Sequence, residues 1–241
     1  MFNKRKTAKL SFSRAYMKCS DVFWKMASLK SRVVDLIARN LREPKGLGGH
    51  FIRVILEKRN TGLEREIVKH LNIQRDDKVI EVGFGPGAGL NAALKNLEHC
   101  SGKVYGIDIS ELIVDHAQTH FKEAIERQKL EIHLGSAMEL PFTENFFNSV
   151  FHTNCYYFWP SLDQGISEMK RVLKPGGIML TGLVHDSLKS FSSKGFFKYG
   201  PNWRPELYIE KLKEGGFVDV SMETVTKPSG HSYQVIFASK P

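Results

Sequence analysis

The sequence predicts an α/β fold: a doubly wound, mostly parallel sheet with an antiparallel last strand, and additional helices at the N-terminus. Two observations carry this prediction. From Lys78 onward, short apolar runs alternate with amphipathic stretches, which is the pattern of strand–helix–strand units. The first apolar run ends in a glycine-rich turn, as a buried strand leading into a helix does. With 41% apolar and 25% charged residues, the 241-residue chain has the composition of an ordinary globular protein.

The positive charge of the chain is concentrated at its N-terminus. Residues 1–60 hold 15 Lys and Arg and 4 Asp and Glu, whereas residues 61–241 hold 20 and 22. We therefore divide the chain into a basic tail with an amphipathic helical cap (1–60) and a nearly neutral α/β domain (61–241). Because that domain lacks a basic surface, the sequence argues against a nucleic-acid partner.

Residues 1–20 are basic, rich in serine and free of acidic residues. We interpret them as a solvated tail, with a mitochondrial transit peptide or a nucleic-acid-binding arm as alternatives. Three widely spaced cysteines and the lack of an apolar signal segment favour a reducing compartment. We expect a cytoplasmic protein, with a mitochondrial location as the alternative.

Helices are expected ahead of the first strand. In residues 21–41, apolar side chains recur at steps of three and four, which predicts a helix packed on the domain. It could also form a lid over a substrate or a basic helix in contact with a membrane surface. After a break at Pro44, two further helices are expected over 50–58 and 63–71, with Asn72 as the stop.

The elements of the domain follow in a fixed order. We expect strands at 78–83, 102–110, 130–137, 149–158, 174–184, 217–223 and 232–240, and helices at 90–97, 111–128, 162–173 and 204–216. The last two strands should form an antiparallel pair. Every earlier strand that is followed by a helix should lie parallel to its neighbours.

The strongest chemical signal is VIEVGFGPGAG at residues 79–89. The turn contains Gly83, Gly85 and Gly87, and glycines let the backbone approach a ligand closely at the start of a helix. Asp108 ends the second strand, where a carboxylate can accept hydrogen bonds from ribose hydroxyls. This pair of features suits either a nicotinamide nucleotide or S-adenosylmethionine.

Three later segments separate these two readings. They are LGSAMELPF at 134–142, FHTNCYYFW at 151–159 and RVLKPGG at 171–177. In this order, and together with the glycine turn, they make residues 40–240 resemble a class I S-adenosylmethionine-dependent methyltransferase of the methyltransferase type 11 family, which acts on small molecules. The resemblance implies S-adenosyl-L-methionine as cofactor and a small molecule as methyl acceptor. A lipophilic molecule is one candidate for that acceptor.

The resemblance also implies which residues hold the cofactor. The methionine end should be lined by Glu81, Gly83, Gly85 and Gly87, and the ribose should be bound by Asp108. The adenine should contact Ile109, Ser136 and Ala137, and Asn154 should lie near the transferable methyl group. Many relatives carry Asp where this chain has Ser136, so the adenine contact of that residue differs from the family pattern.

Methyl transfer is an in-line displacement, in which a base is needed only when the nucleophile arrives protonated. The candidate catalytic residues stand at or after the fourth and fifth strands: His152, Asn154, Tyr157 and His185. His185 is the first to test as a base. Since no cluster of acidic residues follows the fourth strand, we expect no metal.

Two other classes of function remain open. A nicotinamide-dependent oxidoreductase shares the glycine turn and Asp108, but no tyrosine near the expected site has a lysine four residues later, as short-chain dehydrogenases require. A protein with the methyltransferase fold could also act on RNA or protein, through the basic N-terminus, or only bind the cofactor. The sequence carries no feature that fixes the oligomeric state.

Overall fold

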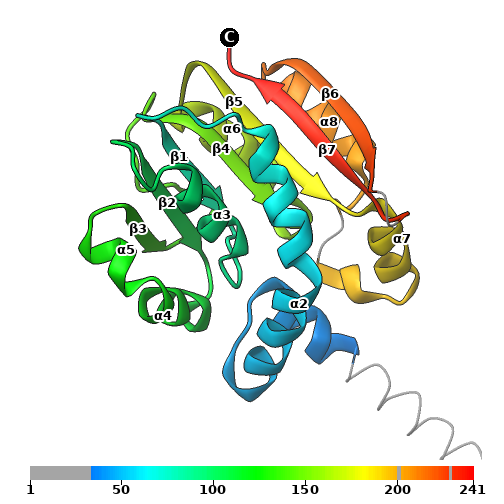
Figure 1. Cartoon of the computed structure of the whole chain (residues 1–241). Coiled ribbons are helices and arrows are strands. Elements are labelled where there is room, and N and C mark those ends of the chain that lie inside the picture. The colour runs from blue at the N-terminus through cyan, green and yellow to red at the C-terminus, as the bar shows by residue number, and fades with distance from the viewer. Residues whose placement is uncertain (1–33, 200–201, 228–229) are drawn as a thin grey trace, which may run out of the picture.

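The computed structural model describes residues 34–199, 202–227 and 230–241. Its centre is a seven-stranded sheet in the order β3-β2-β1-β4-β5-β7-β6 (Figure 1). The strands are β1 Lys78–Val82, β2 Lys103–Asp108, β3 Leu130–Leu134, β4 Phe147–Thr153, β5 Leu173–Leu183, β6 Val218–Thr226 and β7 Ser232–Ser239. β1 to β5 run parallel, whereas β7 is antiparallel to both of its neighbours, β5 and β6. The predicted fold class is therefore confirmed.

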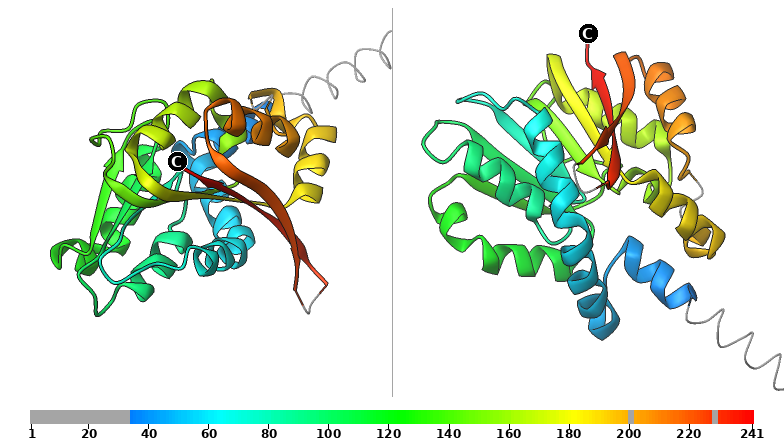
Figure 2. Two further views of the ribbon diagram at one scale, coloured as in Figure 1. Left: turned by 90° about the horizontal axis from the view of Figure 1, so that it is seen from above. Right: turned by 45° about the vertical axis from the view of Figure 1, so that its right-hand side comes forward.

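Helices cover both faces of the sheet. They are α2 Gly46–His70, α3 Ala88–Asn96, α4 Glu111–His120, α5 Lys122–Glu126, α6 Leu162–Val172, α7 His185–Ser193 and α8 Pro205–Glu214, with short 3-10 turns η1 Tyr156–Phe158 and η2 Phe196–Tyr199. Figure 2 shows α2 and α3 on one face and α6 and α8 on the other. The side chains of neighbouring strand residues point to opposite faces of the sheet. Val79 packs in the hydrophobic cluster beneath α2 and α3, and Ile80 packs in the cluster beneath α6 and α8.

One continuous helix, α2, replaces the two helices expected over 50–58 and 63–71. The prediction of a break was wrong because packing outweighs propensity: a glycine inside a helix costs about 1 kcal/mol, whereas Leu63, Ile67 and Leu71 are buried against the sheet and α3. Asn72 ends the helix as predicted, in the left-handed conformation with φ 46°. The helix also crosses the expected 60/61 division.

The single helix expected over 111–128 is divided at Phe121, where the backbone leaves helical geometry (φ −104°, ψ 20°). The ring of Phe121 is buried and lies against Gly87, where a Cβ would come within 2.7 Å of it. Packing of this one ring against the glycine turn accounts for the break.

The predicted strands over 130–137 and 149–158 end early. β3 ends at Leu134, and β4 ends at Thr153, because Asn154 turns the chain with φ 50°. Of the predicted helix over 21–41, residues 34–42 are helical, and the rest lies outside the described residues, as does the basic tail 1–20. Within the described part of the chain, no helix has the length and apolarity to cross a membrane.

Candidate active site

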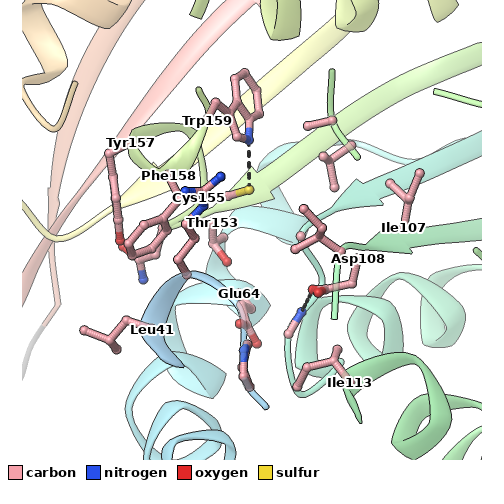
Figure 3. A pocket seen from close by; sticks show the side chains of 18 of the residues that line it. Leu41, Glu64, Ile107, Asp108, Ile113, Thr153, Cys155, Tyr157, Phe158 and Trp159 are labelled. Carbon is pink, nitrogen blue, oxygen red and sulfur yellow. Dashed lines mark hydrogen bonds between the residues drawn. The ribbon is translucent and has the colours of Figure 1, made fainter. Parts of the chain in front are cut away.

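A cavity of about 390 Å³ opens at the carboxyl ends of the central strands (Figure 3). This edge is where the strand order reverses between β1 and β4, the place where open α/β sheets bind ligands. Its walls come from the segment 41–44, from α2, from the turns after β1 to β4, from η1 and from α7. Polar side chains and backbone lie at the turns, and aromatic and aliphatic side chains at η1 and α7.

The glycine turn after β1 presents bare backbone to the cavity. Gly85 has φ 51°, and a Cβ at this position would find no atom within 4 Å, so the space in front of it is open. Gly83 has φ 68°, and a Cβ there would meet the Sγ of Cys155 at 2.5 Å. A side chain at either position would strain the turn, and at Gly85 it would also occupy ligand space.

Asp108 lies beside this turn at the end of β2. Its carboxylate accepts hydrogen bonds from the backbone N–H of Gly85 and of Ser110, both at 3.0 Å. Burial raises the pKa of Asp108 to about 6, although these hydrogen bonds oppose the rise. The next residue, Ile109, lines the cavity with 43% of its surface exposed and offers an apolar face at the rim.

The loop after β3 forms the next part of the wall with Gly135, Ser136, Ala137 and Met138. The hydroxyl of Ser136 accepts a hydrogen bond from the N–H of Met138 at 3.1 Å, and as a hydroxyl it keeps its own proton to donate. The predicted adenine-edge residues therefore do lie at the cavity.

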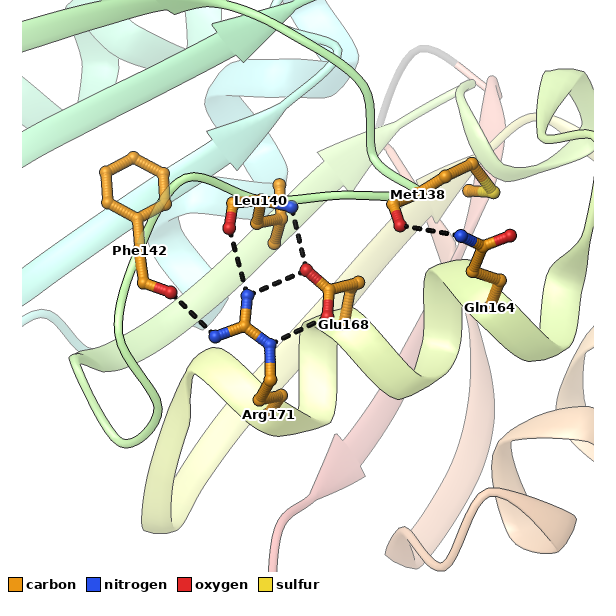
Figure 4. A network of polar contacts seen from close by, with 6 residues as sticks. All are labelled: Met138, Leu140, Phe142, Gln164, Glu168 and Arg171. Atoms are coloured by element: carbon orange, nitrogen blue, oxygen red, sulfur yellow. Dashed lines mark hydrogen bonds and ion pairs between the residues drawn. The ribbon is translucent and has the colours of Figure 1, made fainter.

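Side chains of α6 hold this loop in place (Figure 4). Arg171 donates to the carbonyl oxygens of Leu140 at 2.9 Å and Phe142 at 2.6 Å. Glu168 accepts the N–H of Leu140 at 2.7 Å and pairs with the Arg171 guanidinium. These contacts fix the backbone just beyond Met138.

Two of the predicted cofactor residues do not line the cavity. Gly87 packs beneath Phe121, and the carboxyl of Glu81 lies against Gly89 in the first turn of α3. Glu81 is fully buried, no described side chain lies within hydrogen-bond distance of its oxygens, and the backbone N–H of Leu90 in the first turn of α3 is the donor that favours its charged form. Burial raises its pKa well above the usual value.

Glu64 of α2 does line the cavity, and the sequence analysis missed it. It is 3% exposed, and burial raises its pKa, partly opposed by a hydrogen bond to Thr153. The spacing of apolar residues could have identified it. Glu64 stands three residues before Ile67 and four before Val68, so its carboxyl lies on the buried face of the helix.

The four candidate catalytic residues separate into two pairs. Asn154 and Tyr157 line the cavity. His152 does not: it is fully buried in the core, with Nε2 2.9 Å from the hydroxyl of Tyr208 and 3.0 Å from that of Thr181, and burial lowers its pKa to about 3. His185 also lies outside the lining, and its backbone N–H donates to Gln234 at 2.9 Å. This placement favours a structural role for both histidines.

Cys155 lies in the lining but is no nucleophile. Its Sγ accepts a hydrogen bond from Nε1 of Trp159 at 3.2 Å, and burial raises the pKa of the thiol to about 12. The group is therefore a neutral thiol at physiological pH. Across residues 34–241, apart from the two short gaps, no group of three His, Cys, Asp or Glu residues is arranged to hold a metal ion.

In sequence, this chain is similar to methyltransferases. Residues 80–181 match the Methyltransferase domain family. An uncharacterized methyltransferase, YdaC, of Bacillus subtilis is 32% identical over 51% of this chain and 65% of its own length. The erythromycin 3''-O-methyltransferase of Saccharopolyspora erythraea is 30% identical over 70% and 60%, so this chain spans less than two thirds of either relative. The demethylmenaquinone methyltransferase of Symbiobacterium thermophilum is 31% identical over 70% of this chain and 67% of its own length.

Solved structures share the fold. A chain from the complex between the Haloferax volcanii Trm112 methyltransferase activator and a methyltransferase has a TM-score of 0.68 at 16% identity, covering 78% of this chain and 92% of that one. Phosphoethanolamine N-methyltransferase 2 of Haemonchus contortus, solved with S-adenosylhomocysteine, has a TM-score of 0.61 at 19% identity, covering 75% and 53%. The fold is that of class I S-adenosylmethionine-dependent methyltransferases. The chain belongs to the Methyltransferase domain family, the type 11 group that its motifs resembled.

Proposed function

We propose that this protein transfers the methyl group of S-adenosylmethionine to a small, lipophilic acceptor. The observation that carries the proposal is the composition of one cavity. It joins a polar cradle, made of the turn at Gly85, Asp108 and Ser136, to a wall of apolar and aromatic side chains. A cofactor with a ribose and an adenine matches the first part, and an apolar acceptor matches the second.

The residues present fit the cofactor. The open backbone at Gly85 leaves room for its methionine part, and the carboxylate of Asp108 stands where ribose hydroxyls can donate to it. Ile109 would pack on the adenine, with Ser136 and Ala137 at its edge. When bound, this cofactor supplies a methyl group already activated on a sulfonium.

The task of this chain is then to align the acceptor and exclude water. The cofactor held by these residues would supply the methyl carbon, and its sulfur would keep the electron pair of the broken carbon–sulfur bond as the nucleophilic atom of the acceptor takes the methyl group. Asn154 and Tyr157 are the candidates to orient the nucleophile, since both line the cavity. A nucleophile that arrives as a hydroxyl must release its proton, and neither His152 nor His185 reaches the cavity to accept it.

The acceptor wall supports the lipophilic class. Five uncharged, apolar or aromatic side chains line this part of the cavity, and Arg42 and His231 are the basic side chains that line the same cavity: the five are Leu41, Tyr157, Phe158, Leu188 and Phe191. Relatives named as demethylmenaquinone methyltransferase and 24-methylenesterol C-methyltransferase act on molecules of this kind. We infer that the acceptor is a ring or chain of similar apolar character.

The segment 41–44 forms one wall of the cavity, on the side of the N-terminal helices. Leu41, Arg42 and Pro44 line the cavity, and the carbonyl of Pro44 accepts a hydrogen bond from Ser110 at 2.7 Å. This supports the N-terminal cap expected from the sequence. Removal of residues 1–40 should weaken acceptor binding more than cofactor binding.

Calorimetric titration tests the cofactor. We expect micromolar binding of S-adenosylmethionine and S-adenosylhomocysteine, with no binding of NADH. Binding of NADH alone would overturn the proposal in favour of an oxidoreductase.

A labelled-methyl assay tests the acceptor class. Cell extract is separated into lipid, polar metabolite, RNA and protein fractions, and each is incubated with the enzyme and the cofactor labelled in its methyl group. We expect label in an extractable lipid product. Label in the RNA or protein fraction would refute a lipophilic small-molecule acceptor.

A further inference from the structure

Glu64 of α2 brings a carboxyl group to the carboxyl end of β4. One turn further along the helix, Ile67 packs on Gly182 of β5, where a Cβ would clash with Ile67 and meet the Cγ2 of Thr153 at 3.0 Å. Helix residues three apart share a face, so Glu64 lies one turn nearer the cavity, where it forms a hydrogen bond with Thr153. Both side chains lie at the cavity (Figure 3). Asn154, the residue expected near the transferable methyl group, directly follows Thr153, so Glu64 stands beside the expected place of transfer.

The carboxyl of Glu64 can accept a further hydrogen bond from a molecule in the cavity. A carboxylate accepts at about four lone-pair positions, and the hydrogen bond to Thr153 uses one of them. The residue is 3% exposed and lines the cavity. An acceptor molecule held against the apolar wall therefore meets a carboxyl that is shielded from bulk water.

Other groups of the lining are less suited to accept a proton. Asp108 uses one carboxylate oxygen on the N–H of Gly85 and the other on the N–H of Ser110. Cys155 is a neutral thiol, because burial raises its pKa to about 12. His231 lines the cavity as an exposed residue of the loop between β6 and β7, and it is the competing base.

A hydroxyl is the kind of nucleophile that needs a base inside the site. An amine can lose its proton to solvent before it enters, and a thiol ionises near neutral pH. A hydroxyl keeps its proton until the methyl group is transferred, so the group that takes this proton must lie at the place of transfer. A buried carboxyl that faces the acceptor meets this requirement.

We propose that Glu64 is the general base of the reaction and that the acceptor is a lipophilic hydroxyl compound, methylated on oxygen. The inference rests on the proposed function, since it names the reacting group of that acceptor. As the hydroxyl oxygen takes the methyl group, its proton passes to a carboxylate oxygen of Glu64, and the electron pair of the O–H bond stays on oxygen. The pair of the broken carbon–sulfur bond stays with the sulfur of the cofactor. Glu64 releases the proton to solvent after the product leaves.

The ionisation of Glu64 should control the pH dependence of transfer. Burial raises the pKa of Glu64 above its usual range, so part of the enzyme carries a protonated, inactive Glu64 near neutral pH. The rate should rise with pH by up to about tenfold per unit and level off once Glu64 is ionised. The other ionisable groups that line the cavity or act on Glu64 are Arg42, Glu81, Asp108, Cys155, Tyr157 and His231. A Glu64 variant keeps all of them, so the difference between the two pH profiles belongs to Glu64.

Glu64→Gln keeps the volume of the side chain but removes the base. The acceptor is the lipid fraction of cell extract, and the cofactor is labelled in its methyl group. We expect the single-turnover rate to fall at least about 100-fold and to lose its rise with pH. Calorimetric affinities for S-adenosylmethionine and S-adenosylhomocysteine should stay within about threefold of the wild type, because Glu64 acts on the acceptor.

Two further variants serve as comparisons. Glu66→Gln is the matched control, because Glu66 lies on the same helix, outside the cavity, in ion pairs with Lys69 and Lys227. It removes the same charge and should transfer methyl at the wild-type rate. His231→Gln removes the competing base and should keep the rise of the rate with pH.

The product itself identifies the methylated atom. With a cofactor that carries carbon-13 in its methyl group, the nuclear magnetic resonance shift of the transferred carbon distinguishes a methyl group on oxygen, nitrogen or carbon. We expect a methyl ether. A methyl group on nitrogen or carbon would overturn the inference and leave the proposed function standing.

The remaining outcomes separate the two proposals. If the protein binds no S-adenosylmethionine, or if no lipid is labelled, the proposed function fails and the role of Glu64 with it. If lipid is labelled and Glu64→Gln works at the wild-type rate, the function stands and Glu64 is not the base. The same holds if weaker cofactor binding accounts for the whole loss in Glu64→Gln, or if His231→Gln abolishes the rise with pH.

Discussion

The substitution Asp108→Asn separates the stability of the fold from its capacity to bind the cofactor. The carboxylate of Asp108 accepts one hydrogen bond from Gly85 and one from Ser110, both at 3.0 Å, and it is 9% exposed. Asparagine fits the same space. It has only one accepting oxygen, however, and its NH₂ group must face one of the two backbone donors.

The two effects on stability oppose each other. A rise in pKa from 3.8 to about 6 means that keeping Asp108 ionised at pH 7 costs the folded protein about 3 kcal/mol, at about 1.4 kcal/mol per pKa unit. Asparagine removes that cost but leaves a backbone N–H unpaired, which costs about 1–3 kcal/mol. We therefore expect the free energy of unfolding at pH 7 to stay equal or to rise by up to about 2 kcal/mol.

Cofactor binding has no such compensation. Hydrogen bonds from ribose hydroxyls to a carboxylate are each worth about 1.5–3 kcal/mol, so we expect a loss of at least about 2 kcal/mol, or about 30-fold in affinity. Chemical denaturation and calorimetric titration with S-adenosylmethionine measure the two quantities. The reasoning is refuted if the variant binds the cofactor as tightly as the wild type, or if it is markedly less stable at pH 7.

The pH dependence supplies an internal check. The protonated form of Asp108 is favoured by the fold, so the stability that it contributes is present below pH 3.8 and is lost as the pH rises through about 6. The stability advantage of Asp108→Asn should therefore grow between pH 4 and pH 6 and level off above. An advantage that shrinks as the pH rises would mean that the carboxylate is stabilised by the fold, not penalised.

Three further predictions test other parts of the site. Gly85→Ala should lower the free energy of unfolding by about 1–2 kcal/mol, measured by denaturation, and weaken cofactor binding more than tenfold, measured by titration. Gly176→Ala is the control, because Gly176 has φ 73° and equally open space: it should lower the free energy of unfolding without weakening cofactor binding. Arg171→Lys should weaken cofactor binding severalfold and cost about 1–3 kcal/mol, since the carbonyls of Leu140 and Phe142 lose their shared donor; Arg127→Lys, in an exposed ion pair, is the control. His152→Gln should reduce thermal stability and leave kcat within about threefold, because its partners Tyr208 and Thr181 lie in the core; a large loss of kcat in a stable variant would restore His152 as a catalytic candidate.

The sequence predicts the parts of the site that depend on backbone shape. A turn that needs positive φ requires glycine, and a carboxylate at the end of the second strand stands next to that turn in any doubly wound sheet. For these reasons Gly83, Gly85 and Asp108 could be assigned to the cavity before the structure was known. Asn72 belongs to the same class, since asparagine tolerates the left-handed conformation that ends a helix.

The direction of side chains on a doubly buried strand is harder to predict. In β4 the residues Phe151, His152 and Thr153 are all buried, so hydrophobic alternation does not reveal which face each one serves. A shift of one residue would exchange the core position of His152 for the cavity position of Thr153. In α2 it is burial that is hard to predict. From sequence alone Glu64 would be placed in solvent, because its burial depends on the packing of the whole of α2 on the sheet.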